Sequence, residues 1–469
     1  MLIMFAILLI VLLGFVGLAL DVGQVIGRKT ELQHVVDNAA LAAAPELVGT
    51  PAGLANAVSK ARSSAAGQSL YLRRMQGAPL SDDSIRFASA PDAPDTAWQA
   101  AGAVSDPARA LFVRVDTRNN TPALGQVTTS FLGAWSPALR SLDTGARAVA
   151  GRSSLRITPL AICALSSAPA ALRTNPGPPE RREALEFGFR RGVAYNLFNL
   201  NPHGATAEHF LLNPLGPLGA IGASAQLSDA SVEPFICSGS MLHTAIGNTP
   251  IHAHRPFPTG LWASFNARFN QYAGNRCNPV TAPPDTNIRP FPFTVAGWWM
   301  NVPSGPHAVA TGGSPLLTVA DLPPLPTGTP ASIAPASYGP LWSFAKAVQY
   351  ADPKPAGDYP VFANNAWAGL YPGLPTAPAS NSFYPVSGTP YALPAFSTAP
   401  SGNAGVAQRR VLNIALLACP LPAGSDLLVN VLGIARFFMT APATSSALSG
   451  EFAGMADELA LAGPAELLQ

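Results

Sequence analysis

Residues 1–20 read MLIMFAILLIVLLGFVGLAL, without a charged side chain, and residues 21–44 continue as DVGQVIGRKTELQHVVDNAALAAA. An α-helix rises about 1.5 Å per residue, so the first segment would reach roughly 30 Å as a helix, the thickness of the hydrocarbon core of a bilayer. The sequence therefore predicts a transmembrane anchor over residues 1–20, with most of the chain outside the membrane.

Two other interpretations of the first segment are weaker. A cleaved signal peptide needs a basic start, an apolar run of about 7–15 residues and a cleavage site preceded by two small residues with one other residue between them. Here no Lys or Arg precedes Arg28, and Leu18-Ala19-Leu20 lacks the small pair. A buried core helix is rarely so uniformly apolar over about five turns.

The second segment predicts an amphipathic helical stem over residues 21–48. Its apolar residues recur at spacings of three and four, as on one face of a helix. The alanine end of this stripe would let another helix approach closely, because small side chains allow tight backbone packing. Packing on the chain's own globular part needs the same stripe, so the sequence leaves both uses open. The stripe consists of Val22, Val25, Ile26, Leu32, Val35, Val36, Ala39, Ala40 and Ala43.

The order of residues at this junction resembles a known family. The run Leu18-Ala19-Leu20-Asp21-Val22-Gly23 is followed by Arg28, by Leu32-Gln33 and by the alanine-rich stretch 36–44. This order is similar to the N-terminal region of TadG-like proteins of the tight-adherence (Tad, Flp pilus) assembly system. Those proteins usually have a short leader before the apolar helix, so we expect the true start to lie upstream of Met1.

The resemblance implies a single-pass inner-membrane protein whose bulk lies in the periplasm. It also implies that its partners are the inner membrane and other Tad pilus-assembly proteins or pilins. The positive-inside rule alone would place Arg28 and Lys29 in the cytoplasm, and a basic leader would remove this conflict. Segments 186–197, 266–269 and 282–287 also resemble the C-terminal part of TadG-like proteins.

Composition limits the partners of the remaining chain. The 469 residues are 48% apolar and only 12% charged, with a formal net charge of +2. So small a charge gives no strong field for nucleic acid, and we expect no nucleic-acid partner. The 48 prolines are about twice the usual frequency and concentrate after residue 155, which predicts a loop-rich C-terminal part with short strands.

The order of elements predicts an α+β fold in two further domains. The first is a small α+β domain over residues 49–155. Its expected elements are a helix over 52–76, a loop over 77–105, a half-buried strand over 111–116, a short helix over 122–132 and an extended strand over 138–152.

Residues 156–469 are predicted to form a larger, Pro/Gly-rich, mixed α+β domain in the periplasm. Strands over 411–419 and 427–438 are consecutive and predict a β-hairpin. Segments 305–340 and 372–402 are expected to be long surface loops. The other expected elements are helices over 182–191, 260–272 and 339–350 and a strand over 161–165.

Four cysteines stand at positions 163, 237, 277 and 419. An even number in an exported domain indicates disulfides, for which three pairings exist. We favour Cys163–Cys419 with Cys237–Cys277, because Cys163 and Cys419 lie in apolar runs that could be buried strands of one sheet. Four buried thiols are the alternative. Zinc is not expected, since no two cysteines have metal-finger spacing.

Catalytic patterns are weak in this chain. His252 and His254 would face the same side of a strand and could bind a metal, but the third ligand, among His243, His209 and Glu208, has no fixed spacing. The sequence contains no H-E-x-x-H, no G-x-S-x-G and no phosphate-binding glycine loop. We therefore expect no enzyme, no metal, no cofactor and no small-molecule substrate.

Some TadG-like proteins carry a von Willebrand A domain, whose Mg²⁺ site needs Asp-x-Ser-x-Ser. Here Ile236 stands at the Asp position before Ser238-Gly239-Ser240, and Asp229-Ala230-Ser231 lacks the second Ser. The adhesion metal site is therefore expected to be absent. We interpret the sequence as a membrane-anchored periplasmic component of Flp/Tad pilus assembly with a structural or tethering role. The sequence leaves open a further role as a minor pilus component. The alternatives are an anchored periplasmic metal-dependent enzyme or a secreted adhesin.

Overall fold

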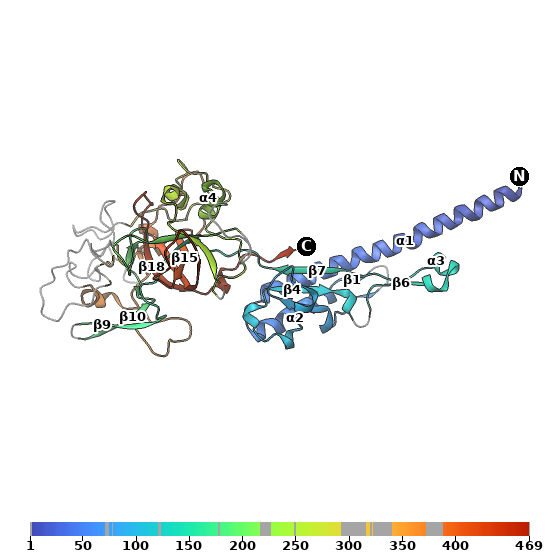
Figure 1. Cartoon of the computed structure of the whole chain (residues 1–469), viewed down its shortest axis with the longest axis horizontal. Helices are drawn as coiled ribbons and strands as arrows, with labels where there is room; N and C mark the ends of the chain where they lie inside the picture. The colour runs from blue at the N-terminus through green and yellow to red at the C-terminus, as the bar shows by residue number, and fades with distance from the viewer. Residues whose placement is uncertain are drawn as a thin grey trace. The chain divides into compact units, whose positions relative to one another are not determined.

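The chain forms two compact units in the computed structural model. Unit 1 comprises residues 1–154 together with 462–469, and unit 2 comprises residues 155–461. Each unit is described by itself (Figure 1). The structure describes residues 2–70, 75–76, 78–120, 123–176, 179–215, 227–247, 250–291, 316–318, 321, 340–371 and 388–468.

A single long helix, α1 (Leu2–Ala43), joins the predicted anchor to the predicted stem. It gives way to a 3₁₀ turn at Ala44–Glu46, where Pro45 has no backbone N–H to continue the α-helical ladder. None of the helices that the described residues form combines the length and apolar character needed to cross a bilayer. The transmembrane anchor over residues 1–20 is therefore not confirmed.

The second helix packs against the C-terminal half of α1. Helix α2 (Pro51–Ala66) begins with Thr50, whose hydroxyl accepts a hydrogen bond from the backbone N–H of Gly53, and Pro51 fits the first turn. Its small residues recur every four positions, which allows a close approach to the alanines of α1. The buried residues of α2 include Leu54, Ala57, Ala61 and Ala65.

A four-stranded antiparallel sheet in the order β19-β7-β4-β3 completes the core of unit 1. Both faces of β4 are buried: Val113 and Val115 join the cluster of α1 and α2, whereas Phe112 packs with Trp98 on the other face. The predicted half-buried strand is thus fully buried. The strands are β3 (Ile85–Ala88), β4 (Phe112–Asp116), β7 (Arg147–Gly151) and β19 (Glu466–Leu468).

Several boundaries predicted in this region were wrong. The helix expected over 52–76 ends at Ala66, because Gly67 follows and β1 (Ser69–Leu70) then pairs with β2 (Met75–Gln76). Residues 71–74 of that prediction lie outside the described residues. The loop expected over 77–105 contains β3, which its pairing with β4 holds extended.

The segment between β4 and β7 forms a hairpin that the sequence did not predict. Strands β5 (Gln126–Thr128) and β6 (Ser141–Asp143) pair antiparallel, and helix α3 (Phe131–Trp135) lies at their tip. The helix expected over 122–132 was therefore wrong, because this segment contains β5 and only the start of α3. The strand expected over 138–152 is right in type but divides into β6 and β7. Pro122 lies outside the described residues.

The described residues of unit 2 form an eight-stranded sheet in the order β12-β18-β17-β15-β8-β13-β14-β16. The edge strand β16 is separated from β17 in the sequence only by Asn430. The sheet must therefore curl, so that the edge at β16 comes near β17 in the opposite half of the sheet. The strands are β8 (Leu160–Cys163), β12 (Ala194–Asn196), β13 (His209–Leu212), β14 (Ile251–His254), β15 (Val411–Leu417), β16 (Asp426–Val429), β17 (Val431–Met439) and β18 (Ser449–Ala456).

The predicted strands near the C-terminus exist, with one difference. β15 pairs antiparallel with β17, but β16 leaves this hairpin and pairs with β14 instead. β15 also runs parallel to β8, with Leu417 opposite Cys163. The α+β class is thus found with a mostly β larger unit.

The helices predicted in unit 2 were largely wrong. Residues 182–191 form the hairpin of β10 (Arg181–Glu186) and β11 (Phe189–Arg190), because Phe187 and Gly188 both adopt the positive φ of a tight turn. Residues 340–350 form no helix and make isolated bridges to Val193, Glu183 and Val361, and Gly339 lies outside the described residues. Segment 260–272 holds only α5 (Trp262–Phe265) between 3₁₀ turns. The other helices are α4 (Asp229–Ser238) and α6 (Trp367–Leu370), and β9 (Ala171–Asn175) pairs with β10.

Candidate functional site

Asp21 fixes the hairpin tip to α1. Its side chain is 1% exposed. One carboxylate oxygen accepts a hydrogen bond from the backbone N–H of Ser130 at 3.1 Å. The other accepts from Phe131 at 2.9 Å and Leu132 at 2.7 Å. These N–H groups open the short helix α3, so the acidic residue satisfies donors that have no partner within that helix.

Arg28 makes the second polar link between α1 and the same region. Its guanidinium is buried, donates two hydrogen bonds to the carbonyl oxygen of Leu124 and lies 3.3 Å from Glu31. Asp21 and Arg28 are seven residues apart in the sequence, two turns of helix, and therefore lie on one side of α1.

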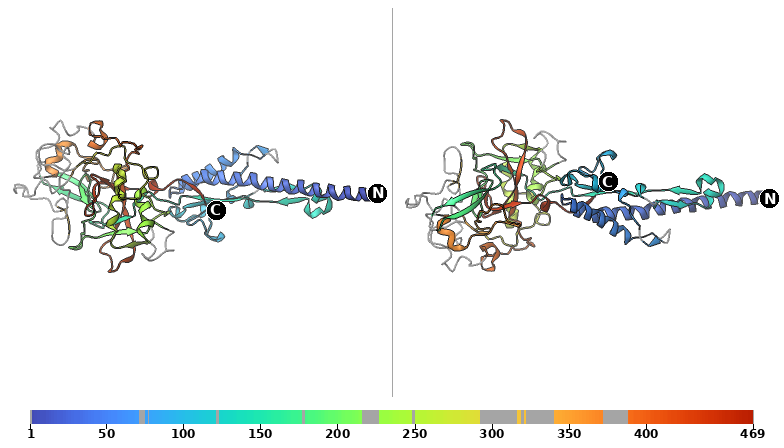
Figure 2. Two further views of the ribbon diagram at one scale, coloured as in Figure 1. Left: turned by 90° about the horizontal axis from the view of Figure 1, so that it is seen from above. Right: turned by 90° about the horizontal axis from the view of Figure 1, so that it is seen from below.

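A glycine permits the close approach of the hairpin. A Cβ on Gly17 would lie 2.3 Å from the ring of Phe131, whereas a Cβ on Gly14 would meet nothing within 4 Å. Figure 2 shows the hairpin running alongside α1 in both views, in agreement with the contacts between α1 and α3. Gly17, Asp21 and Arg28 thus all take part in one contact, in which the segment with the β5–β6 hairpin packs against α1.

Beyond this contact, apolar side chains are exposed around the N-terminal half of α1 and on the hairpin tip. Trp135 is the most open of them, at 89% exposed. We call this set the N-terminal apolar surface. It consists of Met4, Phe5, Leu8, Leu9, Leu12, Leu13, Phe15, Val16, Leu18, Leu20, Val22 and Ile26 on α1 and of Phe131, Trp135 and Leu139 on the hairpin.

The predicted stripe of α1 divides between two environments. Its members from Leu32 onward are buried within unit 1, against α2 and the sheet. Val22 and Ile26 are exposed, and Val25 is half-buried. The C-terminal part of the stripe therefore packs on the chain's own domain, and only the N-terminal part is open to a partner. The buried members are Leu32, Val35, Val36, Ala39, Ala40 and Ala43.

Comparison with known proteins bears on this same region. Residues 1–46 match the Tad family model, described as "Putative Flp pilus-assembly TadE/G-like". The chain carries a Tad-family segment at its N-terminus. The resemblance to TadG-like proteins is confirmed over the segment that holds Gly17, Asp21 and Arg28. No curated protein and no solved structure matches the chain.

The part of the chain beyond the Tad segment is held by two disulfides. The structure joins Cys163 to Cys419, with Cα atoms 5.5 Å apart, and Cys237 to Cys277, with Cα atoms 5.4 Å apart. These are the pairs that the sequence analysis favours. The first joins the end of β8 to the residues after β15, which are parallel neighbours.

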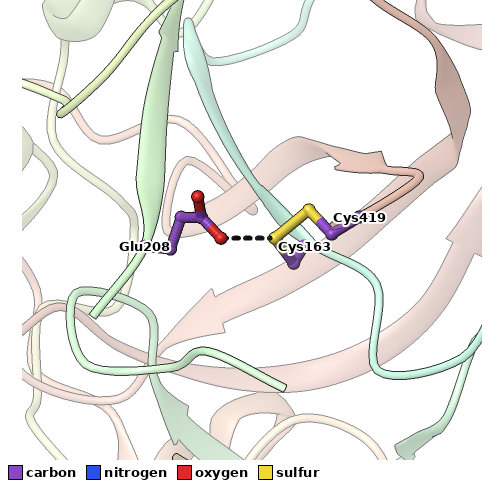
Figure 3. A group of neighbouring side chains, drawn as sticks. All are labelled: Cys163, Glu208 and Cys419. Carbon is purple, nitrogen blue, oxygen red and sulfur yellow. Dashed lines mark hydrogen bonds between the residues drawn. A yellow bond between two sulfur atoms is a disulfide. The ribbon is translucent and has the colours of Figure 1, made fainter. Parts of the chain in front are cut away.

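Among the residues that the structure describes, one group of potential metal ligands consists of the first disulfide and Glu208. The Oε2 atom of Glu208 lies 3.5 Å from Sγ of Cys163, and Cys419 completes the group (Figure 3). A sulfur in a disulfide is no thiolate, so it lacks the charge that holds a metal ion. Glu208 pairs instead with Nη2 of Arg255 at 2.7 Å.

The histidines singled out from the sequence do not converge with Glu208. His252 and His254 lie half-buried on β14, and Nδ1 of His254 is 3.3 Å from Asp426. His209 and His243 are buried, and burial lowers the pKa of each imidazole. Within the ranges that the structure describes, no histidine joins a three-ligand group.

The candidate adhesion motif lies on a helix end. Ser238 is the last residue of α4, and Gly239 caps that helix in the left-handed conformation. Ile236 is fully buried in the core of unit 2. A Mg²⁺ site of the adhesion type follows a buried strand, so this position differs in its backbone as well as in its missing Asp.

Proposed function

We propose that this chain is a component of Flp pilus assembly, held in the inner membrane by the N-terminal half of α1, with unit 2 in the periplasm. The Tad segment supports a pilus-assembly role. The N-terminal apolar surface supports the membrane contact, because exposed apolar patches on this scale mark interfaces with proteins or lipid. The single observation that carries the proposal is the Tad match over this exposed helix.

The mechanism that we propose is tethering. α1 is continuous from its exposed apolar half into the core of unit 1, so a partner or bilayer that holds one half also holds the folded unit. Tethering raises the effective concentration of the chain beside pilins and other assembly proteins, without a catalytic step. Asp21 and Arg28 would keep the hairpin tip, with Trp135, at the level where the helix becomes apolar.

Trp135 suits a position at the membrane surface. Tryptophan is enriched at membrane–water interfaces, where its ring is apolar and its N–H is polar. Arg140 follows on the same hairpin and is exposed. An aromatic side chain with a nearby cation is the usual composition of an interfacial contact.

Fractionation and piliation test the proposal together. Full-length protein should remain in the inner-membrane fraction after high-salt and alkaline washes, with the segment 1–20 intact by N-terminal sequencing of the mature chain. Deletion of the gene should reduce piliation, and the full-length chain should restore it. Recovery of the protein as a soluble species cleaved after residue 20, or unchanged piliation, would contradict the proposal.

A further inference from the structure

A basic cavity lies wholly within unit 2, separate from the Tad segment. Its volume is about 600 Å³. Five basic side chains line it against two acidic ones, Asp358 and Asp457. The basic residues are Arg156, Arg268, Lys354, Arg409 and Arg436.

Ion pairs with residues outside the cavity neutralise the charges of Lys354 and Asp358. Nζ of Lys354 lies 3.3 Å from Glu186, and the carboxylate of Asp358 lies 2.6 Å from Nη1 of Arg191. Asp457 is exposed at the rim and accepts a hydrogen bond from the backbone N–H of Leu459. The excess of positive charge in the cavity therefore comes from the four arginines.

These four guanidinium groups form no ion pair with a carboxylate of the residues described, and their hydrogen bonds go to backbone carbonyl oxygens. Arg409 donates to Pro283, Ser238 and Cys237 at 2.7–3.1 Å. Nη2 of Arg268 donates to Ile236 at 3.0 Å, and Nη2 of Arg436 donates to Ala453 at 3.0 Å. Arg156 is exposed at the rim and donates to Ala460.

Arg268 is the decisive residue. It is 1% exposed, and within the described parts of the chain its Nε and Nη1 atoms have no hydrogen-bond partner. The same holds for Nε of Arg436. Burial, and then the neighbouring charge of Arg409, lower the pKa of Arg268. A buried cation with free donors is costly unless an anion compensates it.

The C-terminus of α4 compensates only part of this charge. Arg268 and Arg409 both donate to its last carbonyl oxygens, and a helix C-terminus carries the equivalent of about half a negative charge. Two guanidinium groups exceed that by more than one full charge. Both arginines line the cavity.

Gly239 lines the cavity where the arginines meet the end of α4. A Cβ there would lie 2.8 Å from Nη2 of Arg268, 3.7 Å from the hydroxyl oxygen of Thr158 and 3.9 Å from Nη1 of Arg409. The first of these distances is too short for a Cβ, so only glycine fits at this point, where two cations and a hydroxyl lie close together. Hydrogen-bond donors of this kind around one point suit the oxygens of a compact oxyanion.

We propose that this cavity is a binding site for a small molecule that carries a phosphate-like oxyanion, held by Arg268, Arg409 and Arg436. The volume exceeds that of inorganic phosphate, so the natural ligand has a further polar part, for which Ser238, Gln408 and Asn413 line the cavity. The inference is independent of the pilus role, because every lining residue belongs to unit 2.

Calorimetric titration of the full-length protein with inorganic phosphate, at constant ionic strength set by chloride, tests the site. Saturable binding by the wild type, weakened at least tenfold by Arg268→Gln and by Arg436→Gln, is expected. Exposed Arg182→Gln, outside the cavity, is the matched control and should bind as the wild type does. Equal binding by all four proteins, an adventitious ion only, or no binding at all would overturn the proposal.

Thermal unfolding provides a second readout. In chloride alone, Arg268→Met should raise the unfolding midpoint, since replacing an only partly compensated buried charge by an apolar group of similar size is stabilising. Saturating phosphate should raise the midpoint of the wild type by more than that of Arg268→Met. A midpoint that Arg268→Met lowers in chloride, or that phosphate raises equally in both proteins, contradicts the proposal.

Discussion

The carboxylate of Asp21 lies 2.9 Å from the backbone nitrogen of Phe131, 110 residues further along the chain. This contact joins the long helix α1 to the tip of a hairpin. A charged residue that follows twenty apolar ones is usually taken as the end of an anchor. Here the charge also has an internal role, because it receives three backbone N–H groups that would otherwise lack partners.

Replacing Asp21 by Asn should loosen the hairpin tip. The substitution removes the charge that strengthens three hydrogen bonds, and we expect a loss of about 1–3 kcal/mol in the stability of this contact. Hydrogen exchange of the amides of Ser130, Phe131 and Leu132 should accelerate. Asp37→Asn, which changes a half-buried carboxylate of the same helix, should leave those three amides protected. Unchanged exchange in the Asp21 variant would refute the contact.

Two glycines of α1 offer a matched comparison. Gly→Ala within a helix gains up to about 1 kcal/mol of propensity at either position. Gly14→Ala should therefore be neutral or stabilising, whereas Gly17→Ala should push the ring of Phe131 away. Limited trypsin digestion in detergent should then cleave faster at the exposed Arg140 in the Gly17 variant alone. Equal cleavage in both variants would show that the hairpin does not dock as described.

The two disulfides should contribute to stability in the order of their loop lengths. The chain-entropy model gives up to about 5 kcal/mol for Cys163–Cys419, with a sequence separation of 256, and about 4 kcal/mol for Cys237–Cys277, with a separation of 40. Denaturant unfolding of the two double Cys→Ser variants measures both values. Free thiols in the wild-type protein under non-reducing conditions would contradict both bridges.

Glu451 should make the stability of unit 2 depend on pH. Burial raises the pKa of its carboxyl to about 7. The folded state therefore holds the proton more tightly than the unfolded state, whose pKa is about 4.5. The contribution of this carboxyl to stability is complete below pH 4.5, falls by up to about 1.4 kcal/mol per pH unit as the pH rises to 7, and does not change further above that.

Glu451→Gln should remove this part of the pH dependence. The matched control is Glu180→Gln, which changes an exposed carboxylate of the same unit. Chemical unfolding at intervals between pH 4.5 and 8 measures the slopes. A slope that is the same in the wild type and in the Glu451 variant would show that the carboxyl titrates outside this range.

Local patterns in the sequence predicted the elements that depend on local order. The stripe of α1, the strand at 112–116 and the antiparallel pair β15–β17 all follow from apolar spacing. The helix predicted over residues 182–191 was wrong. The run RREALEF has a helix-favouring composition, but the positive φ angles of Phe187 and Gly188 make a turn. Pairing with β9 then holds residues 181–186 as the strand β10, and the apolar spacing of the segment itself does not indicate that pairing.

The candidate site was predicted only where it is local. The motif around Asp21 identified the family, but no pattern along the chain links it to Phe131 or Trp135. The charged Asp21 directly after twenty apolar residues was the one sequence feature that indicated a buried partner. The basic cavity was equally hidden, because its arginines come from distant parts of the chain and meet only in the folded unit.

Site-specific photocrosslinking in the cell tests the central claim most directly. A crosslinking residue at Ile26, which is 60% exposed, should capture pilins or other Tad assembly proteins from the membrane fraction. The crosslinking amino acid placed instead at Val36, which is fully buried, should yield only crosslinks within the chain. Capture of assembly subunits from position 26 and not from position 36 is the result that we predict. Crosslinks within the chain alone from both positions, with the protein outside the membrane fraction, would contradict the account.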